Sequence, residues 1–131
     1  MSGLGIMNEK VRKVIELSGE DFYACYQCGR CTSGCPAAPF MDIMPNQITK
    51  YLQLGMVDEL LESNAIWVCF SCYNCVTWCP KGVDIGKLTE ALRLLRLREN
   101  IDYVKIEELQ PEVVGELPPI ALVGGFRKLT A

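Results

Sequence analysis

The sequence contains no histidine among its 131 residues. Without an imidazole, it offers no histidine ligand for zinc, for a Rieske-type iron–sulfur cluster or for haem. It also lacks the side chain that most often serves in general acid–base catalysis. Metal or redox chemistry in this sequence therefore has to use sulfur.

Long apolar runs and strong charge are missing as well. The longest apolar run, residues 65–70, is far shorter than the roughly 20 residues that a membrane-spanning helix needs. Residues 1–10 show no basic segment leading into an apolar stretch, so we expect no signal peptide and a cytoplasmic location. The formal net charge of −3 gives no reason to expect a nucleic-acid partner.

Cysteine, by contrast, is abundant, with eight residues in one modest chain. Disulfides, zinc sites and iron–sulfur clusters could each explain that number. Disulfides are disfavoured because the cytoplasm keeps thiols reduced. A chain this short buries a limited core, so cross-links of some kind would help to stabilise it. Metal binding is the favoured explanation.

The eight cysteines form two copies of one motif, C-x2-C-x2-C-x3-C-P. The first copy consists of Cys25, Cys28, Cys31, Cys35 and Pro36, and the second of Cys69, Cys72, Cys75, Cys79 and Pro80. Each cysteine of the second copy lies 44 positions after its counterpart, and the apolar residues 22–23 align with 66–67. This is an internal duplication.

The spacing predicts two cubane [4Fe–4S] clusters. Three thiolates at i, i+3 and i+6 can surround one cube, and in two-cluster proteins the fourth cysteine of each run ligates the other cluster. We therefore expect one cluster on Cys25, Cys28, Cys31 and Cys79, and the other on Cys69, Cys72, Cys75 and Cys35. Such crossed ligation would hold the two halves of the chain together.

The competing interpretation is a pair of zinc sites with four cysteines each. Structural zinc sites usually join two C-x2-C pairs across a long gap. Here four cysteines fall within eleven positions, twice. The spacing therefore favours the clusters, and we expect the fold to be lost with them.

The remaining residues predict an all-α fold. Asn8 begins a helix that ends near Leu17 before Gly19, Pro45 begins another that ends at Gly55, and a short helix follows around residues 57–61. A last helix runs from the cap Asp84 to about residue 100, with its inner face built from Leu88, Ala91, Leu92 and Leu95. Its other side offers the basic residues Lys87, Arg93, Arg96 and Arg98, which we expect to face solvent or a docking partner.

Residues 1–100 are thus expected to form an α-helical dicluster domain with an N-terminal helix. Residues 101–131 differ in character, because three prolines (Pro111, Pro118 and Pro119) interrupt any long helix and residues 120–126 are apolar and glycine-punctuated. We expect an irregular C-terminal tail that docks either on the chain's own core or on a partner. The sequence leaves both possibilities open.

Several stretches together resemble the C subunit of heterodisulfide reductase and its bacterial Hdr-like relatives. They are C-Y-Q-C-G-R-C-T-S-G-C-P at residues 25–36, Q-L-G at 53–55, I-W-V-C at 66–69 and C-P-K-G-V-D-I at 79–85. The resemblance covers residues 22–98 and implies the α-helical ferredoxin fold. That fold also occurs in the iron–sulfur subunits of succinate dehydrogenase and of anaerobic glycerol-3-phosphate dehydrogenase.

The resemblance implies an electron-relay subunit of an oxidoreductase complex. In such complexes a flavin-containing A subunit passes electrons to the C subunit, which hands them to a catalytic B subunit that reduces a disulfide. The sequence has no Cys-Cys-Gly motif, no G-x-G-x-x-G loop and no cysteine beyond the eight, so we expect no catalytic residue on this chain. The alternatives are a freely diffusing dicluster ferredoxin and the iron–sulfur subunit of another flavoprotein oxidoreductase, such as a sulfur-oxidising Hdr-like assembly.

Overall fold

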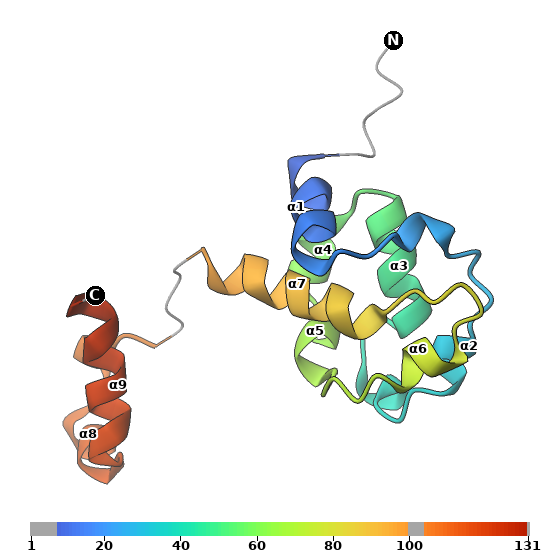
Figure 1. Cartoon of the computed structure of the whole chain (residues 1–131). Coiled ribbons are helices and arrows are strands. Elements are labelled where there is room, and N and C mark those ends of the chain that lie inside the picture. The colour runs from blue at the N-terminus through green and yellow to red at the C-terminus, as the bar shows by residue number, and fades with distance from the viewer. Residues whose placement is uncertain (1–7, 100–103, 131) are drawn as a thin grey trace. The chain divides into compact units, whose positions relative to one another are not determined.

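The structure, a computed structural model, describes residues 8–99 and 104–130, and every regular element within them is a helix (Figure 1). The expectation of an all-α chain is confirmed. The chain divides into two compact units, Met1–Glu99 and Asn100–Ala131. Over the described residues, none of the helices has the length and apolarity that crossing a membrane would require.

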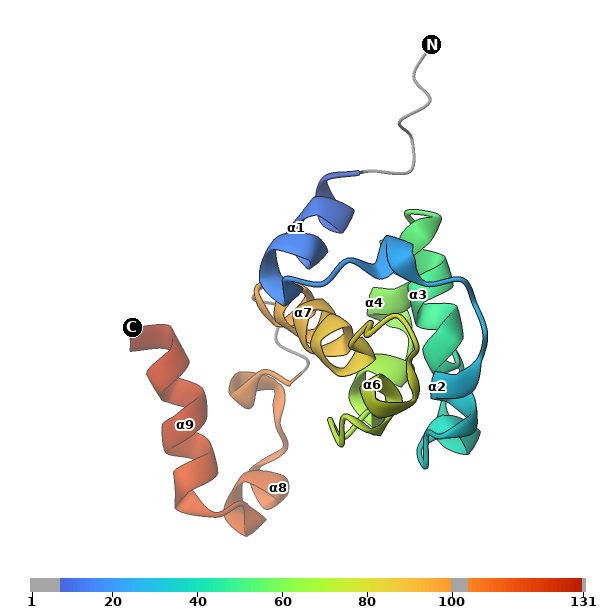
Figure 2. The ribbon, with the colours of Figure 1, turned by 45° about the vertical axis from the view of Figure 1, so that its right-hand side comes forward.

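Helix α1 (Glu9–Ser18) begins and ends where the sequence predicts. The Asn8 side chain accepts a hydrogen bond from the backbone N–H of Val11 at 2.8 Å, and Gly19 ends the helix in the left-handed region at φ 67°. Val11 and Val14 are fully buried. The helix packs on α7, as both ribbon views show (Figures 1 and 2).

The first unit consists of two similar halves joined by helix α4 (Val57–Glu62). The first half contains η1 (Phe22–Ala24), α2 (Arg30–Ser33) and α3 (Pro45–Gln53), and the second contains α5 (Ala65–Val68), α6 (Asn74–Trp78) and α7 (Ile85–Leu97). In each half the two short helices pack on the long one, and α2 also packs on α6. The duplication of the cysteine motif is therefore a duplication of structure.

The core lies where the long helices of the two halves meet. Ile48 and Leu52 of α3 are fully buried, and so are Leu88 and Leu92, which occupy the same positions in α7. Spacing of i and i+4 places each pair on one helix face. This shared core brings the first turns of both helices next to the cysteine motifs.

Two carboxylates hold the beginning of α7. Asp84 caps the helix by accepting a hydrogen bond from the backbone N–H of Lys87 at 3.2 Å, as predicted. Glu20, before the first motif, accepts from the backbone N–H of Asp84 at 3.3 Å and pairs with the Lys87 ammonium at 3.0 Å. The helix ends at Leu97, and the predicted end at residue 100 lies outside the described residues.

The second unit contains more helix than the sequence suggested. It holds η3 (Ile106–Glu108), α8 (Pro111–Glu116) and α9 (Pro119–Thr130), so the expected irregular tail is wrong for these segments. Pro111 and Pro119 are the first residues of their helices, where a missing N–H costs nothing and the fixed φ is already helical. The side chain of Ile106 lies against Gly125, so η3 packs on α9.

Candidate cluster-binding sites

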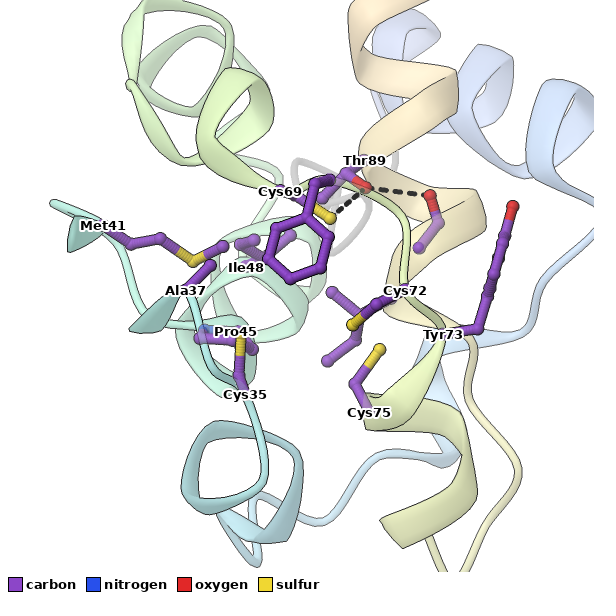
Figure 3. Close-up of a pocket in the computed structure, with 13 residues that line it drawn as sticks. Cys35, Ala37, Met41, Pro45, Ile48, Cys69, Cys72, Tyr73, Cys75 and Thr89 are labelled. Carbon is purple, nitrogen blue, oxygen red and sulfur yellow. Dashed lines mark hydrogen bonds between the residues drawn. The ribbon is translucent and has the colours of Figure 1, made fainter. Parts of the chain in front are cut away.

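Two cavities in the first unit are each lined by four cysteines. Figure 3 shows the second of them, which is lined by Cys35, Cys69, Cys72 and Cys75 and has an empty volume of about 410 Å³ when the solvent at its mouth is included. Its walls are otherwise largely apolar, with Met41 and Ile48 on one side and Phe70 and Tyr73 among the others. The first cavity, with an empty volume of about 310 Å³ that likewise includes the solvent at its mouth, is lined by Cys25, Cys28, Cys31 and Cys79.

In each cavity, three cysteines come from one motif and the fourth is the last cysteine of the other motif. Cys35 lies with the second motif, and Cys79 lies with the first. Ile85, the first residue of α7, lines both cavities, so the two spaces adjoin at one buried side chain. Each half of the chain thus contributes thiols to both cavities.

Both motif loops turn through the same backbone conformations. The residue before the second cysteine has a positive φ in each loop, 62° at Gln27 and 55° at Ser71. The residue after it does as well, 77° at Gly29 and 57° at Tyr73. Left-handed residues reverse the chain within a few positions, which lets three cysteines approach one space. Gln27, Ser71 and Tyr73 adopt this conformation without being glycine and therefore store backbone strain at the two sites.

A buried threonine contacts the first cysteine of each motif. Thr49 Oγ1 lies 3.4 Å from the sulfur of Cys25. Thr89 Oγ1 lies 3.4 Å from the sulfur of Cys69, and Figure 3 shows this second contact. Each is the fifth residue of its long helix, and neither is accessible to solvent. The first cavity has a further polar contact, because the Gln27 side-chain amide lies 3.4 Å from the Cys25 sulfur.

Four residues further along each helix, a second pair of side chains holds the backbone that leads into the motif. The Gln53 amide donates to the carbonyl oxygens of Phe22 and Cys25, at 3.0 and 2.9 Å. The Arg93 guanidinium donates to the equivalent carbonyls of Ile66 and Cys69. The prediction that Arg93 belongs to the outer, basic side of this helix is wrong, because its side chain turns back toward the second motif.

Local sequence pattern predicts a role at the cysteine motifs for none of these four side chains, although the duplication contains a signal. The cysteine motifs repeat with an offset of 44, whereas the helices that follow repeat with an offset of 40. At that second offset P-N-Q-I-T-K-Y-L-Q aligns with I-G-K-L-T-E-A-L-R, which places Thr49 on Thr89 and Gln53 on Arg93. A comparison at a single offset cannot find them.

Burial changes the acidity of two of the thiols. It raises the pKa of Cys31 to about 11, against weaker opposing hydrogen bonds from Thr32. It also raises the pKa of Cys75, where hydrogen bonds from the backbone N–H of Gly86 and Val76 act in the opposite direction. Both thiols are neutral at neutral pH unless a bound metal displaces the proton.

The donor set and the space fit two [4Fe–4S] clusters. Each cavity offers four thiols in largely apolar surroundings, as a cubane with four cysteine ligands requires. No three ligand-type side chains in the described part of the chain converge closely enough to hold one metal ion.

Comparison with known proteins points to the same type of cofactor. The family profile of the 4Fe-4S dicluster domain matches residues 20–83. The matched segment includes all eight cysteines, η1 and α2 to α6, and it ends at Val83, directly before Asp84, the cap of α7. Residues 20–83, just under half of the chain, are therefore similar to a 4Fe–4S dicluster domain.

Several curated relatives are C subunits of heterodisulfide reductases, the family that the sequence motifs resemble. The chain is 42% identical over 76 residues to the iron–sulfur C subunit of CoB–CoM heterodisulfide reductase from Methanopyrus kandleri. The aligned region covers 58% of this chain and 40% of the relative. It is 42% identical over 82 residues to the C subunit of ferredoxin:CoB-CoM heterodisulfide reductase from Methanosarcina acetivorans, covering 63% and 33%. The protein of the same name from Methanosarcina mazei is 29% identical over 115 residues, covering 86% and 71%.

The resemblance to the C subunit of heterodisulfide reductase is thereby confirmed. For the first two relatives the chain spans less than half of their own length, 40% and 33%. The dicluster domain and these homologues support an iron–sulfur electron-transfer subunit.

Proposed function

We propose that this chain, a homologue of the C subunit of heterodisulfide reductase, relays electrons between two other subunits of a heterodisulfide-reductase-type complex. One partner is a flavin-containing A-type subunit, and the other is a catalytic B-type subunit that reduces a disulfide. The complex is cytoplasmic, residues 101–131 dock on the chain's own core or on a partner, and no substrate is converted on this chain. The observation that carries the proposal is the pair of adjoining four-cysteine cavities.

The proposed ligand sets follow the cavities. Cys25, Cys28, Cys31 and Cys79 hold the first cluster, and Cys69, Cys72, Cys75 and Cys35 hold the second. When bound, each cluster accepts and releases one electron at a time. The largely apolar walls limit the access of water to the buried and half-buried cysteines, and among the described residues Ile85 is the one side chain that lines both sites. Electrons therefore have a short route between the two clusters.

The exposure of the two cysteine motifs supports the proposal that electrons enter and leave the chain at its surface. The middle cysteines of the two loops, Cys28 and Cys72, are the exposed ones. Next to the second loop, Phe70 and Trp78 leave 63% and 54% of their surface accessible, and Trp67 leaves 47%. Large exposed aromatic side chains commonly mark protein interfaces. This supports a subunit with stable neighbours over a freely diffusing carrier.

Double cysteine variants test the crossed ligation. Cys25→Ser with Cys79→Ser removes two ligands of one cluster, so the anaerobically reconstituted protein should keep about half of its iron. Cys25→Ser with Cys35→Ser removes one ligand from each cluster and should deplete both. If the second double variant kept one complete cluster and the first kept none, each motif would hold its own cluster, and the crossed assignment would be wrong.

Anaerobic purification from native extract tests the relay. We expect the chain to co-purify with a flavoprotein and with a second iron–sulfur protein, which mass spectrometry would identify. Elution alone, at its own mass of 14.6 kDa, would mean a diffusible ferredoxin. Co-purification with a succinate- or glycerol-phosphate-oxidising flavoprotein would point to another class of oxidoreductase.

A further inference from the structure

Thr49 and Thr89 occur at the same place in the two halves and make the same contacts. Each hydroxyl donates to the carbonyl oxygen three residues earlier, Thr49 to Asn46 at 2.7 Å and Thr89 to Gly86 at 2.8 Å. Each hydroxyl oxygen also lies 3.4 Å from a cysteine sulfur. A single hydroxyl hydrogen therefore has two acceptors within reach, a carbonyl and a sulfur.

The ordinary explanation for such a threonine is a helix-internal hydrogen bond. Buried threonines often bond the carbonyl three or four residues back, and this alone satisfies the hydroxyl. It does not explain why the hydroxyl oxygen lies at the same distance from a motif sulfur in both halves. It also does not explain why threonine occurs in both, because valine fills the same volume without a polar atom.

We infer that the hydroxyls of Thr49 and Thr89 donate hydrogen bonds to the sulfur atoms of Cys25 and Cys69, and that this bond strengthens when the cluster is reduced. The inference rests on the ligand sets proposed above. The cluster gains one electron from a one-electron donor and exchanges no proton. The hydroxyl hydrogen stays on its oxygen and only turns from the carbonyl toward the sulfur.

The physical reason is the change of charge on the ligand sulfur. Reduction adds negative charge to the cluster and its thiolates, and hydrogen bonds to a charged acceptor are stronger than those to a neutral one. Both hydroxyls are closed off from water, so no solvent molecule competes for the sulfur. A donor that favours the reduced form raises the reduction potential. The two threonines are thus positioning residues that tune the clusters.

The two sites differ in one further donor. In the first half, the Gln27 amide donates to the Thr49 hydroxyl oxygen at 3.1 Å and lies 3.4 Å from the Cys25 sulfur. Ser71 occupies the equivalent loop position in the second half. The amide fixes the Thr49 oxygen beside its cysteine, whereas Thr89 depends on its helix alone. When the Thr49 hydroxyl is removed, the Gln27 amide still lies beside the Cys25 sulfur, whereas the second half has no such amide. Loss of the threonine hydroxyl should therefore lower the potential of the second cluster more strongly.

Valine and serine variants test the inference on the purified, reconstituted chain without partners. Thr89→Val keeps the volume and removes the hydroxyl, and Thr89→Ser keeps the hydroxyl. An anaerobic redox titration followed by EPR should show one of the two midpoint potentials lowered in Thr89→Val. At a fixed potential the ratio of reduced to oxidised cluster should fall roughly tenfold, which corresponds to about 59 mV for one electron. Thr89→Ser should keep the wild-type value.

The matched control is Ser63→Ala. Ser63 is also a buried hydroxyl, but it donates to Asp42 Oδ1 at 2.6 Å and does not line either cavity. Ser63→Ala should leave both midpoint potentials unchanged. Thr49→Val should lower the other midpoint potential, the one that Thr89→Val does not change. A second readout is the coupling of exchangeable deuterons to the reduced cluster in heavy water, measured by ENDOR, which should lose one deuteron in Thr89→Val.

Unchanged midpoints and deuteron couplings in a Thr89→Val protein that retains all of its iron would overturn the inference. If that variant fails to bind its clusters, Thr89→Ala removes the same hydroxyl with no added bulk and is titrated instead. Failure of the ligand assignment would look different, because the Cys25→Ser/Cys35→Ser variant would then keep one complete cluster and the Cys25→Ser/Cys79→Ser variant would keep none.

Discussion

Removing the guanidinium of Arg93 should release the second cluster much faster and leave the first one in place. In the structure, Arg93 donates hydrogen bonds to the carbonyl oxygens of Ile66 and Cys69. These bonds tie α5 itself, at Ile66, and the residue that follows it, Cys69, to the long helix α7. Arg93→Met keeps the length and apolar stem of the side chain and removes both donors.

The size of the effect follows from the charge and the burial of the donor. A hydrogen bond from a charged group contributes about 1.5–3 kcal/mol, and a neutral one about 0.5–1.5 kcal/mol. Arg93 is only partly buried, so we take about 2–3 kcal/mol for both of its bonds together. At 1.4 kcal/mol for each factor of ten, the loop around Cys69 should open roughly 30- to 100-fold more often.

The assay is the rate at which iron is lost to a chelator under anaerobic conditions. Arg93→Met should give two phases of equal amplitude, one accelerated and one at the wild-type rate. Gln53→Met, the equivalent change in the first half, removes two neutral hydrogen bonds of about 1–2 kcal/mol together and should accelerate the other phase roughly 5- to 30-fold. Arg93→Gln should restore much of the stability, since glutamine performs this task in the first half.

Arg98→Met is the matched control, because Arg98 is an exposed arginine just beyond the end of the same helix. It should change the rate of iron loss by less than twofold, in line with the small effects of most surface substitutions. Equal acceleration of both phases in Arg93→Met would show that the arginine stabilises the whole unit. An unchanged rate would show that its hydrogen bonds contribute nothing to holding the loop.

Three further predictions concern stability. Gly86→Ala should destabilise the first unit by about 1–3 kcal/mol in denaturant unfolding, because the new Cβ would lie 2.8 Å from the Tyr73 ring. The control is Gly124→Ala in α9, where the new Cβ meets nothing within 4 Å, so this change should be neutral or stabilising by about 0.5–1 kcal/mol. Leu92→Ala should cost about 2–5 kcal/mol because Leu92 is fully buried, and the same loss at Leu97, which is 60% exposed, should stay within about 0.5 kcal/mol. Chelation of the iron should abolish most of the helical far-UV circular dichroism of the first unit, and an unchanged spectrum would show that the fold does not depend on the clusters.

The sequence predicted the helices of the first unit well because their ends carry strong local signals. Asn8, Pro45 and Asp84 begin three helices in the structure as predicted, and Gly19 ends the first. Each acts through its own backbone or nearest neighbours, so no knowledge of the fold is needed. The same reasoning applies to Pro111 and Pro119, which begin helices in the second unit, although a proline considered by itself indicates only an interruption.

The contacts of Thr49, Thr89, Gln53 and Arg93 could not be predicted from local pattern. Each side chain reaches a motif residue at least 20 positions away, so its role depends on how the helix packs against the loop. An arginine on an amphipathic helix is ordinarily assigned to solvent, because its long side chain can reach water from almost any position. The duplication was the available guide, and it had to be followed at two offsets.

The change of offset from 44 to 40 has a structural reason. Ten positions separate Cys35 from Pro45, but only six separate Cys79 from Ile85. The longer connection of the first half contains η2 (Ala38–Phe40) and then Asp42. The shorter connection of the second half has four residues fewer, so the additional residues of the first half can make contacts that the second half does not make.

Asp42 uses that room to hold the beginning of the second half. Its carboxylate accepts hydrogen bonds from the Ser63 hydroxyl at 2.6 Å and from the backbone N–H groups of Asn64 and Ala65 at 3.0 and 3.1 Å. Partial burial opposes the charge, but these bonds outweigh it and lower the pKa of Asp42. Helix α5 has no cap from the side chain of its own N-cap residue, whereas η1, its counterpart, is capped by Asp21. The four additional residues thus let the first half cap the helix that leads into the second motif, a link between the halves that does not depend on bound iron.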